Sequence, residues 1–222
     1  MGPWDIMSHH FIEKTKPPQG VSSFTKIRLG WIDRDLLSFV KPGDSRCVFL
    51  SPLSKKGKTQ AVKIPLKKSW GGEWKHYYLV ENRQHIGYDR LLPDTGILVL
   101  KVNLEVMEGS GTVKLMDADP GSSYFSHATY RLDRQNRNAF IDKKNNVAVI
   151  PLWSEKGNLG VLITTPEKSK AALKAALMIR KLFKRFPEPR GKAKNESIRE
   201  CVASFKSLDF ETCSTKARQI LQ

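Results

Sequence analysis

The sequence contains little cysteine. Its three cysteines, Cys47, Cys201 and Cys213, are odd in number and never stand in Cys-x-x-Cys spacing, which excludes a zinc ribbon and a dense disulfide framework. A bond between Cys201 and Cys213 is one interpretation, and free thiols are the expectation. Long apolar runs are lacking too, since no stretch reaches the roughly 18 apolar residues of a membrane span. We therefore expect neither a signal peptide nor a transmembrane segment, and localisation stays open.

Acidic residues are scarce relative to basic ones. The chain has 22 Asp and Glu against 38 Lys and Arg, a formal net charge of +16, and a pI near 9.8. Such an excess favours acidic partners, namely nucleic acid, anionic lipid or acidic polypeptides, or else only confers solubility. Charge alone does not choose among these.

Motifs of the common hydrolases are missing. A catalytic zinc needs three protein ligands, an open position for water and a general base. No His-Glu-x-x-His motif is present, and adjacent His9 and His10 are expected in a solvated loop. Gly-x-Ser-x-Gly and phosphate-binding glycine loops are also absent. We assign no catalytic and no metal-binding residue. The five histidines are His9, His10, His76, His85 and His127.

A series of strand signals does occur between residues 41 and 165, in a chain of 222 residues that is 40% apolar. Short apolar and β-branched stretches are separated by Gly, Asp and Asn turns, which predicts a mainly β fold, an antiparallel β-sandwich. Residues 96–102 are nearly all apolar and are expected to form a central strand buried on both faces. The candidate strands are 46–50, 60–65, 74–82, 96–102, 111–116, 147–152 and 159–165.

Residues 1–7 have the composition of a packed turn rather than of a fraying end. A Gly-Pro pair fixes a tight turn, Trp4 supplies a large apolar plate, and the Asp5 carboxylate can accept bonds from turn amides. Met7 follows two residues later. Residues 20–32 then predict a short helix, whose apolar side chains at helical spacing are Phe24, Ile27 and Trp31.

Two of these segments carry a family resemblance. The sequences Gly-Pro-Trp-Asp-Ile-Met (2–7) and Ser-Phe-Thr-Lys-Ile-Arg-Leu-Gly-Trp (23–31) resemble the part of immune-inhibitor-A-like zinc metallopeptidases that lies just downstream of their zinc site. Further blocks that look like this family are Tyr-Tyr-Leu-Val-Glu-Asn-Arg (77–83), Gly-Tyr-Asp (87–89), Leu-Pro-Asp-Thr-Gly-Ile-Leu-Val (92–99), 113–120 and 138–147. The resemblance covers residues 1–165.

The resemblance implies a metzincin-type Met-turn at Trp4, Asp5 and Met7, which in the family is an apolar floor under the zinc-bound histidines. Residues 1–40 would then be a remnant of a catalytic domain that cleaves polypeptides with zinc. Family members are typically secreted. The His-Glu-x-x-His helix that precedes this turn in the family is not in this chain. We therefore expect the C-terminal part only, with the catalytic segment as a missing partner and no zinc or proteolysis in the chain itself.

One block of the resembling region, residues 77–83 at the end of a predicted strand, carries charged residues. Glu81 and Arg83 alternate onto one side of the strand, and Asp89 or Asp94 could meet the guanidinium across a loop. An active site is one interpretation. A structural ion-pair network of Glu81, Arg83 and Asp89 that ties the strand to a turn is the expected use. Where family members often have a His and an Asp, this chain has Lys101 and Asn103.

Oxygen-donor side chains cluster near two later turns. They suggest calcium, but no Asp-x-Asp-x-Asp-Gly loop with a closing Glu accompanies them. Ordinary turn capping is therefore the expectation. The side chains concerned are Asp117, Asp119, Asp142, Asn145 and Asn146.

The last segment, residues 166–222, falls outside the resemblance. Residues 170–186 predict a basic amphipathic helix after a Pro166 start, and shorter helices are expected over 195–206 and 209–221. This tail could contact nucleic acid or an anionic membrane, but packing against the sandwich is the commoner outcome. The apolar stripe is Ala172, Ala176, Ile179, Phe183 and Phe186.

Two functions follow from these observations. The first is the non-catalytic C-terminal part of a zinc metallopeptidase. The second is a stand-alone β-sandwich binding protein whose basic tail serves an acidic partner.

Overall fold

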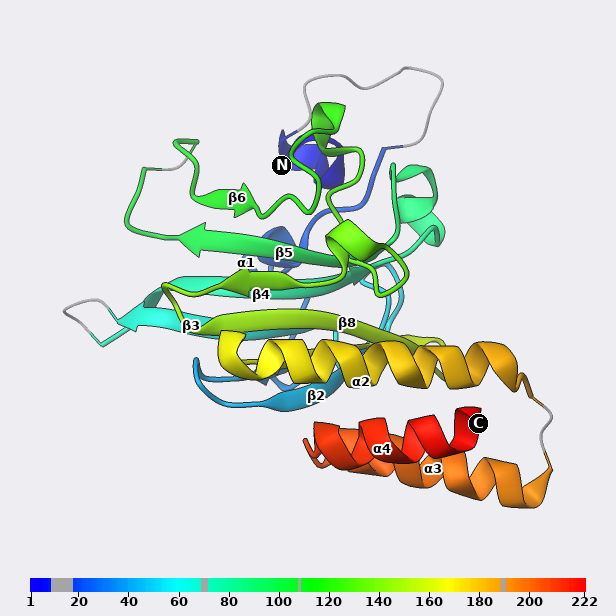
Figure 1. The fold of residues 1–222 in the computed structure, drawn as a ribbon. Coiled ribbons are helices and arrows are strands. Elements are labelled where there is room, and N and C mark those ends of the chain that lie inside the picture. The colour runs from blue at the N-terminus through cyan, green and yellow to red at the C-terminus, as the bar shows by residue number, and fades with distance from the viewer. Residues whose placement is uncertain (9–17, 69–71, 108, 189–190) are drawn as a thin grey trace.

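The computed structural model describes residues 1–8, 18–68, 72–107, 109–188 and 191–222. Two sheets and three C-terminal helices make up most of it (Figure 1). The five-stranded sheet has the order β1-β3-β4-β5-β6, and the four-stranded sheet has the order β2-β9-β8-β7. The strands are β1 (Leu37–Phe39), β2 (Arg46–Leu50), β3 (Ala61–Lys68), β4 (Trp74–Arg83), β5 (Gly96–Asn103), β6 (Val113–Leu115), β7 (Phe140–Asp142), β8 (Val147–Glu155) and β9 (Asn158–Thr164).

Most neighbouring strands are antiparallel, as predicted, but the prediction is wrong at one edge. β1 runs parallel to β3, with Leu37 opposite Ala61. Parallel neighbours need a crossover connection, and here the chain between them passes through β2, which pairs with β9 in the other sheet. The segment between β2 and β3, residues 51–60, therefore connects the two sheets, whereas the sequence favours pairing of the strands at 46–50 and 60–65 through a turn at residues 55–58.

An apolar layer lies between the two sheets. Tyr78 and Val80 of β4 reach it from the five-stranded sheet, and Val149 of β8 and Val161 of β9 reach it from the four-stranded sheet. Alternate residues on the same strands point the other way, because side chains in a strand alternate between faces. β5 is buried along both faces from residue 96 to residue 100, as predicted for a central strand.

The outer face of the five-stranded sheet is covered by the N-terminal segment. Trp4 and Phe24 pack there against Tyr77 and Leu79 of β4. The helix in this segment, α1 (Ser23–Arg28), is shorter than predicted. Gly30 adopts a φ of +68° just after it, a left-handed conformation that ends helices. Trp31 is therefore 64% exposed instead of packing with Phe24.

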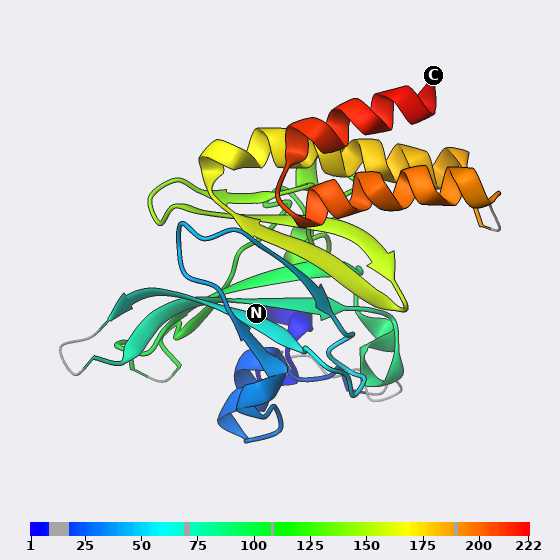
Figure 2. The same cartoon turned by 90° about the horizontal axis from the view of Figure 1, so that it is seen from below.

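The outer face of the four-stranded sheet is covered by the helical tail. Thr165 caps the first helix by accepting a bond from the Lys168 amide at 3.3 Å, with Pro166 at its first position. Figures 1 and 2 show the helices and the N-terminal segment on opposite sides of the sheets. No described helix has the length and apolarity needed to span a bilayer. The helices are α2 (Pro166–Arg185), α3 (Lys192–Lys206) and α4 (Phe210–Leu221).

The apolar stripe of α2 packs inward, in a cluster with Trp153, Phe205 and Phe210. Cys201 and Cys213 are buried in the same cluster as thiols, with their sulfur atoms 3.4 Å apart.

We predict that Phe205→Ala lowers the free energy of unfolding by about 3–5 kcal/mol, because it leaves a cavity. Phe205 is fully buried, with ring centroids 5.3 Å from Trp153 and 5.2 Å from Phe210. Urea unfolding measures the change. Met107→Ala is the control, since Met107 is 82% exposed. Equal stability of the two variants would show that the helices do not depend on this packing.

Candidate functional site

The N-terminal turn is fixed by one buried ring and one carboxylate. Two short 3-10 turns, Gly2–Trp4 and Ile6–Ser8, flank Asp5. Trp4 is fully buried, and its indole Nε1 donates to the Phe125 carbonyl at 2.8 Å. Asp5 Oδ1 accepts from the Met7 amide at 2.9 Å. Met7 itself is 75% exposed, so the turn presents the methionine outward.

Asp5 also joins this turn to the start of α1. Its Oδ2 accepts from the Ser22 amide at 3.0 Å and from Thr25 Oγ1 at 2.8 Å. Ser22 is the N-cap of α1. One carboxylate that is 3% exposed therefore orients both the turn and the helix that follows.

The structure brings Glu81, Arg83 and Asp89 together in a buried network. Arg83 donates through Nη1 to Glu81 Oε1 and through Nη2 to Asp89 Oδ1, both at 2.9 Å. Its Nη1 also donates to the Trp4 carbonyl at 3.0 Å. Burial alone would lower the pKa of Arg83, but the two carboxylates outweigh it and raise the pKa. The network thus connects β4, the Gly87–Leu91 turn and the N-terminal turn.

Each carboxylate of this network is already engaged. Glu81 Oε2 accepts from the Ser23 amide at 2.7 Å, and both acids are at most 1% exposed. A general base must reach the proton that it abstracts. Gly20 shows how closely the chain encloses Asp89, because a Cβ on Gly20 would lie 2.5 Å from Asp89 Oδ1. The geometry favours a structural use over acid–base chemistry.

Asp94, the other carboxylate considered for Arg83, belongs to a separate cluster. It pairs with Arg137 at 2.8 Å and with Arg131 at 3.3 Å. It also accepts from Thr129 Oγ1 at 2.7 Å and from the Thr95 amide at 2.8 Å. Burial opposes ionisation of Asp94, but these partners outweigh it and lower its pKa.

The described histidines lie far from a zinc-ligand arrangement. His76 contacts Glu105 at 2.6 Å, His85 contacts the Leu92 carbonyl at 2.8 Å, and His127 lies 3.5 Å from Asp119. Within the described ranges no three His, Cys, Asp or Glu side chains gather as a metal site. These residues do not fit a catalytic zinc. His9 and His10 lie outside the described residues.

The calcium candidates fall in two separate turns, where local bonds engage them. Asp117 Oδ1 accepts from the Asp119 amide at 2.9 Å. Asp142 accepts from the Tyr78 hydroxyl at 2.5 Å and from the Asn145 amide at 3.1 Å. The bonds from the Asp119 and Asn145 amides are those of turn capping, whereas the Tyr78 bond comes from β4 of the other sheet. Asn146, which follows, has a φ of +54°.

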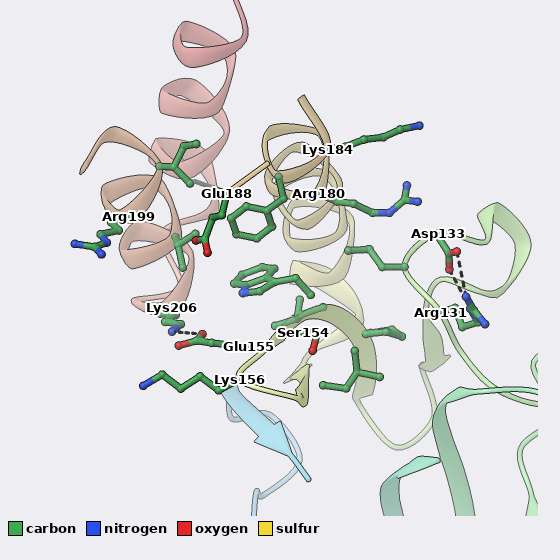
Figure 3. A pocket seen from close by; sticks show the side chains of 18 of the residues that line it. Arg131, Asp133, Ser154, Glu155, Lys156, Arg180, Lys184, Glu188, Arg199 and Lys206 are labelled. Carbon is green, nitrogen blue, oxygen red and sulfur yellow. Dashed lines mark hydrogen bonds and ion pairs between the residues drawn. The ribbon is translucent and has the colours of Figure 1, made fainter. Parts of the chain in front are cut away.

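A groove that the sequence pattern did not indicate lies beside the helices. It has a volume of about 1100 Å³ and is formed by α2, α3, the β8–β9 hairpin and residues 131–133 (Figure 3). Its floor includes Trp153, Phe183 and Val202, and charged side chains surround it. Sequence periodicity identifies the apolar side of each helix, but the groove depends on how α3 lies beside α2. The only sequence feature that points toward this groove is the basic amphipathic helix predicted over residues 170–186.

Comparison of the chain with protein-family models, with curated proteins and with solved structures gives no match.

The Arg83 network predicts a large loss of stability on truncation. Arg83→Met keeps much of the volume but leaves Glu81 and Asp89 buried without their counter-charge, which costs about 3–5 kcal/mol. Urea unfolding at neutral pH measures the change. The control is Arg131→Met, whose partly exposed pairs contribute about 0–1 kcal/mol. A loss at Arg83 no larger than at Arg131 would contradict the structural role.

The Asp94 cluster predicts a pH dependence of stability. A carboxyl whose folded pKa is depressed contributes stability above its unfolded pKa of about 3.9, and that contribution is lost as pH falls through the lower folded pKa. Asp94→Asn should therefore be less stable than wild type at pH 5 to 7, and the difference should shrink below about pH 4. Urea midpoints across this range measure it. If the stability difference between wild type and Asp94→Asn does not change with pH, ionisation of Asp94 does not contribute to folding stability.

Proposed function

We propose that the chain is the non-catalytic C-terminal part of a metallopeptidase-like protein, a β-sandwich preceded by a Met-turn. The observation that carries this proposal is the outward Met7 on a turn that Trp4 and Asp5 hold through hydrogen bonds. Met7 is 75% exposed and so available to a neighbouring segment, while the bonds of Trp4 and Asp5 fix the turn that carries it. The family resemblance of residues 2–7 and 23–31 points to the same use.

The zinc ligands would come from a separate polypeptide segment, because the described residues do not fit the metal. In this arrangement Met7 gives the catalytic segment an apolar floor, and polypeptides are the substrates of the assembled protein. Arg83 supports the floor indirectly, since it holds the Trp4 carbonyl at 3.0 Å. In this proposal the catalytic segment is positioned by Trp4, Asp5 and Met7. The N-terminal turn is itself supported by Glu81, Arg83 and Asp89.

A second candidate is a stand-alone binding protein for an acidic partner. A specific observation favours it, namely the groove in Figure 3 with its surrounding basic side chains. The formal net charge of +16 would draw such a partner in. This function needs neither zinc nor a catalytic segment.

We predict that the purified chain neither retains stoichiometric zinc nor cleaves casein, with or without added zinc. The reason is the absence of a fitting ligand set in the described residues. Metal analysis and a casein assay with and without chelator test it, with Met7→Ala measured alongside. One zinc per chain together with chelator-sensitive cleavage in wild type would overturn the proposal. Its ligands would then be sought among His9, His10, His76, His85 and His127.

The DNA upstream of the Met1 codon separates the two candidates. An open frame that encodes His-Glu-x-x-His there would support the metallopeptidase proposal. A translation start signal preceded by an in-frame stop codon would contradict it and leave the binding protein.

A further inference from the structure

The groove beside α2 and α3 has an apolar floor built around Trp153. Trp153 is 9% exposed and is enclosed by aromatic rings. Its ring centroid lies 5.3 Å from Phe205, 5.9 Å from Phe183 and 6.4 Å from Phe49, with edge-to-face geometry in each case. Val202 of α3 completes one side of this floor. The floor suits aliphatic side chains entering from above.

The acidic side chains that line the groove already have partners. Asp133 pairs with Arg131 at 3.1 Å, and Glu155 pairs with Lys206 at 2.9 Å. Glu188 is engaged as well. The negative charge of the lining is thus compensated from within the chain.

Several cations of the lining are left over. Within the described residues, Lys156, Arg180, Lys184 and Arg199 are exposed and have no acidic partner within 4.0 Å. Arg180 and Lys184 are one helical turn apart on α2, about 6 Å along its axis. Figure 3 shows them on one side of the groove and Arg199 on the other. The surplus positive charge therefore flanks the apolar floor.

We infer that this groove binds an acidic polypeptide segment that carries apolar side chains between its carboxylates. The apolar side chains contact the partly exposed Phe183 and Val202 of the floor, and the carboxylates meet Arg180, Lys184 and Arg199. Charge complementarity selects the partner, and apolar burial supplies much of the affinity. This inference rests on the second candidate function and is independent of the metallopeptidase proposal.

The same geometry disfavours the other acidic partners. Single-stranded nucleic acid binds by stacking bases on accessible aromatic faces, and the Trp153 ring is covered by its neighbours. A membrane surface is broad, whereas this apolar floor lies in a groove between two helices and a hairpin. An extended polypeptide in which apolar and acidic side chains alternate is narrow enough to reach this floor.

The test is fluorescence anisotropy with two short labelled peptides, one of Glu-Leu repeats and one of Glu-Ser repeats. Wild type is compared with Arg180→Glu/Lys184→Glu and with Lys174→Glu/Lys181→Glu, a control on the same helix with the same change in net charge. All four positions are exposed, so both variants should fold, which circular dichroism checks. Oligo-dT and phosphatidylserine vesicles are the remaining probes.

We expect wild type to bind the Glu-Leu peptide more tightly than the Glu-Ser peptide. The groove variant should bind it at least about tenfold more weakly, and the control variant within about threefold of wild type. If both variants bind the Glu-Leu peptide equally weakly, or if neither binds it more weakly than wild type, the groove is not the binding site. The binding function itself would still stand. Failure of wild type to bind either peptide would overturn the binding function itself. Tighter, groove-dependent binding of oligo-dT or vesicles would overturn the choice of a polypeptide.

Discussion

The buried guanidinium of Arg83 is the constraint on which the N-terminal half of the structure depends. A permanently charged group with five donors cannot be buried without acceptors. Glu81, Asp89 and the Trp4 carbonyl supply them from three separate parts of the chain. The Nε atom has no partner among the described residues, so the terminal nitrogens carry the whole connection. Removing any one acceptor would affect the turn, the strand and the loop together.

The alternation of β4 gives this network its place. Leu79, Glu81 and Arg83 point to the outer face, while Tyr78 and Val80 point to the layer between the sheets. The strand has seven consecutive buried residues, from 77 to 83, because both of its faces are covered. A polar network on the outer face is tolerated only beneath such a cover, which the Trp4 turn and α1 provide.

Sequence reasoning located most of the long elements and few of the short ones. The strand at 96–102 and the helix after Pro166 are long enough for composition and capping to identify them. β1 and β7 have three residues each, too few for a pattern to repeat. The alternation of Glu81 and Arg83 was visible, but the choice of Asp89 over Asp94 depended on which loop folds back. The parallel edge and the groove likewise arise from packing between distant segments.

The two candidate functions use opposite sides of the sheets and do not compete for residues. The turn that presents Met7 lies over the five-stranded sheet, and the groove lies beside α2 and α3 over the four-stranded sheet (Figures 1 and 2). The apolar layer between the sheets separates them, and the Tyr78 hydroxyl of one sheet reaches Asp142 of the other. Packed cores switch between discrete arrangements rather than deforming continuously. A partner in the groove would therefore be expected to add a binding function to the chain without altering the geometry around Arg83.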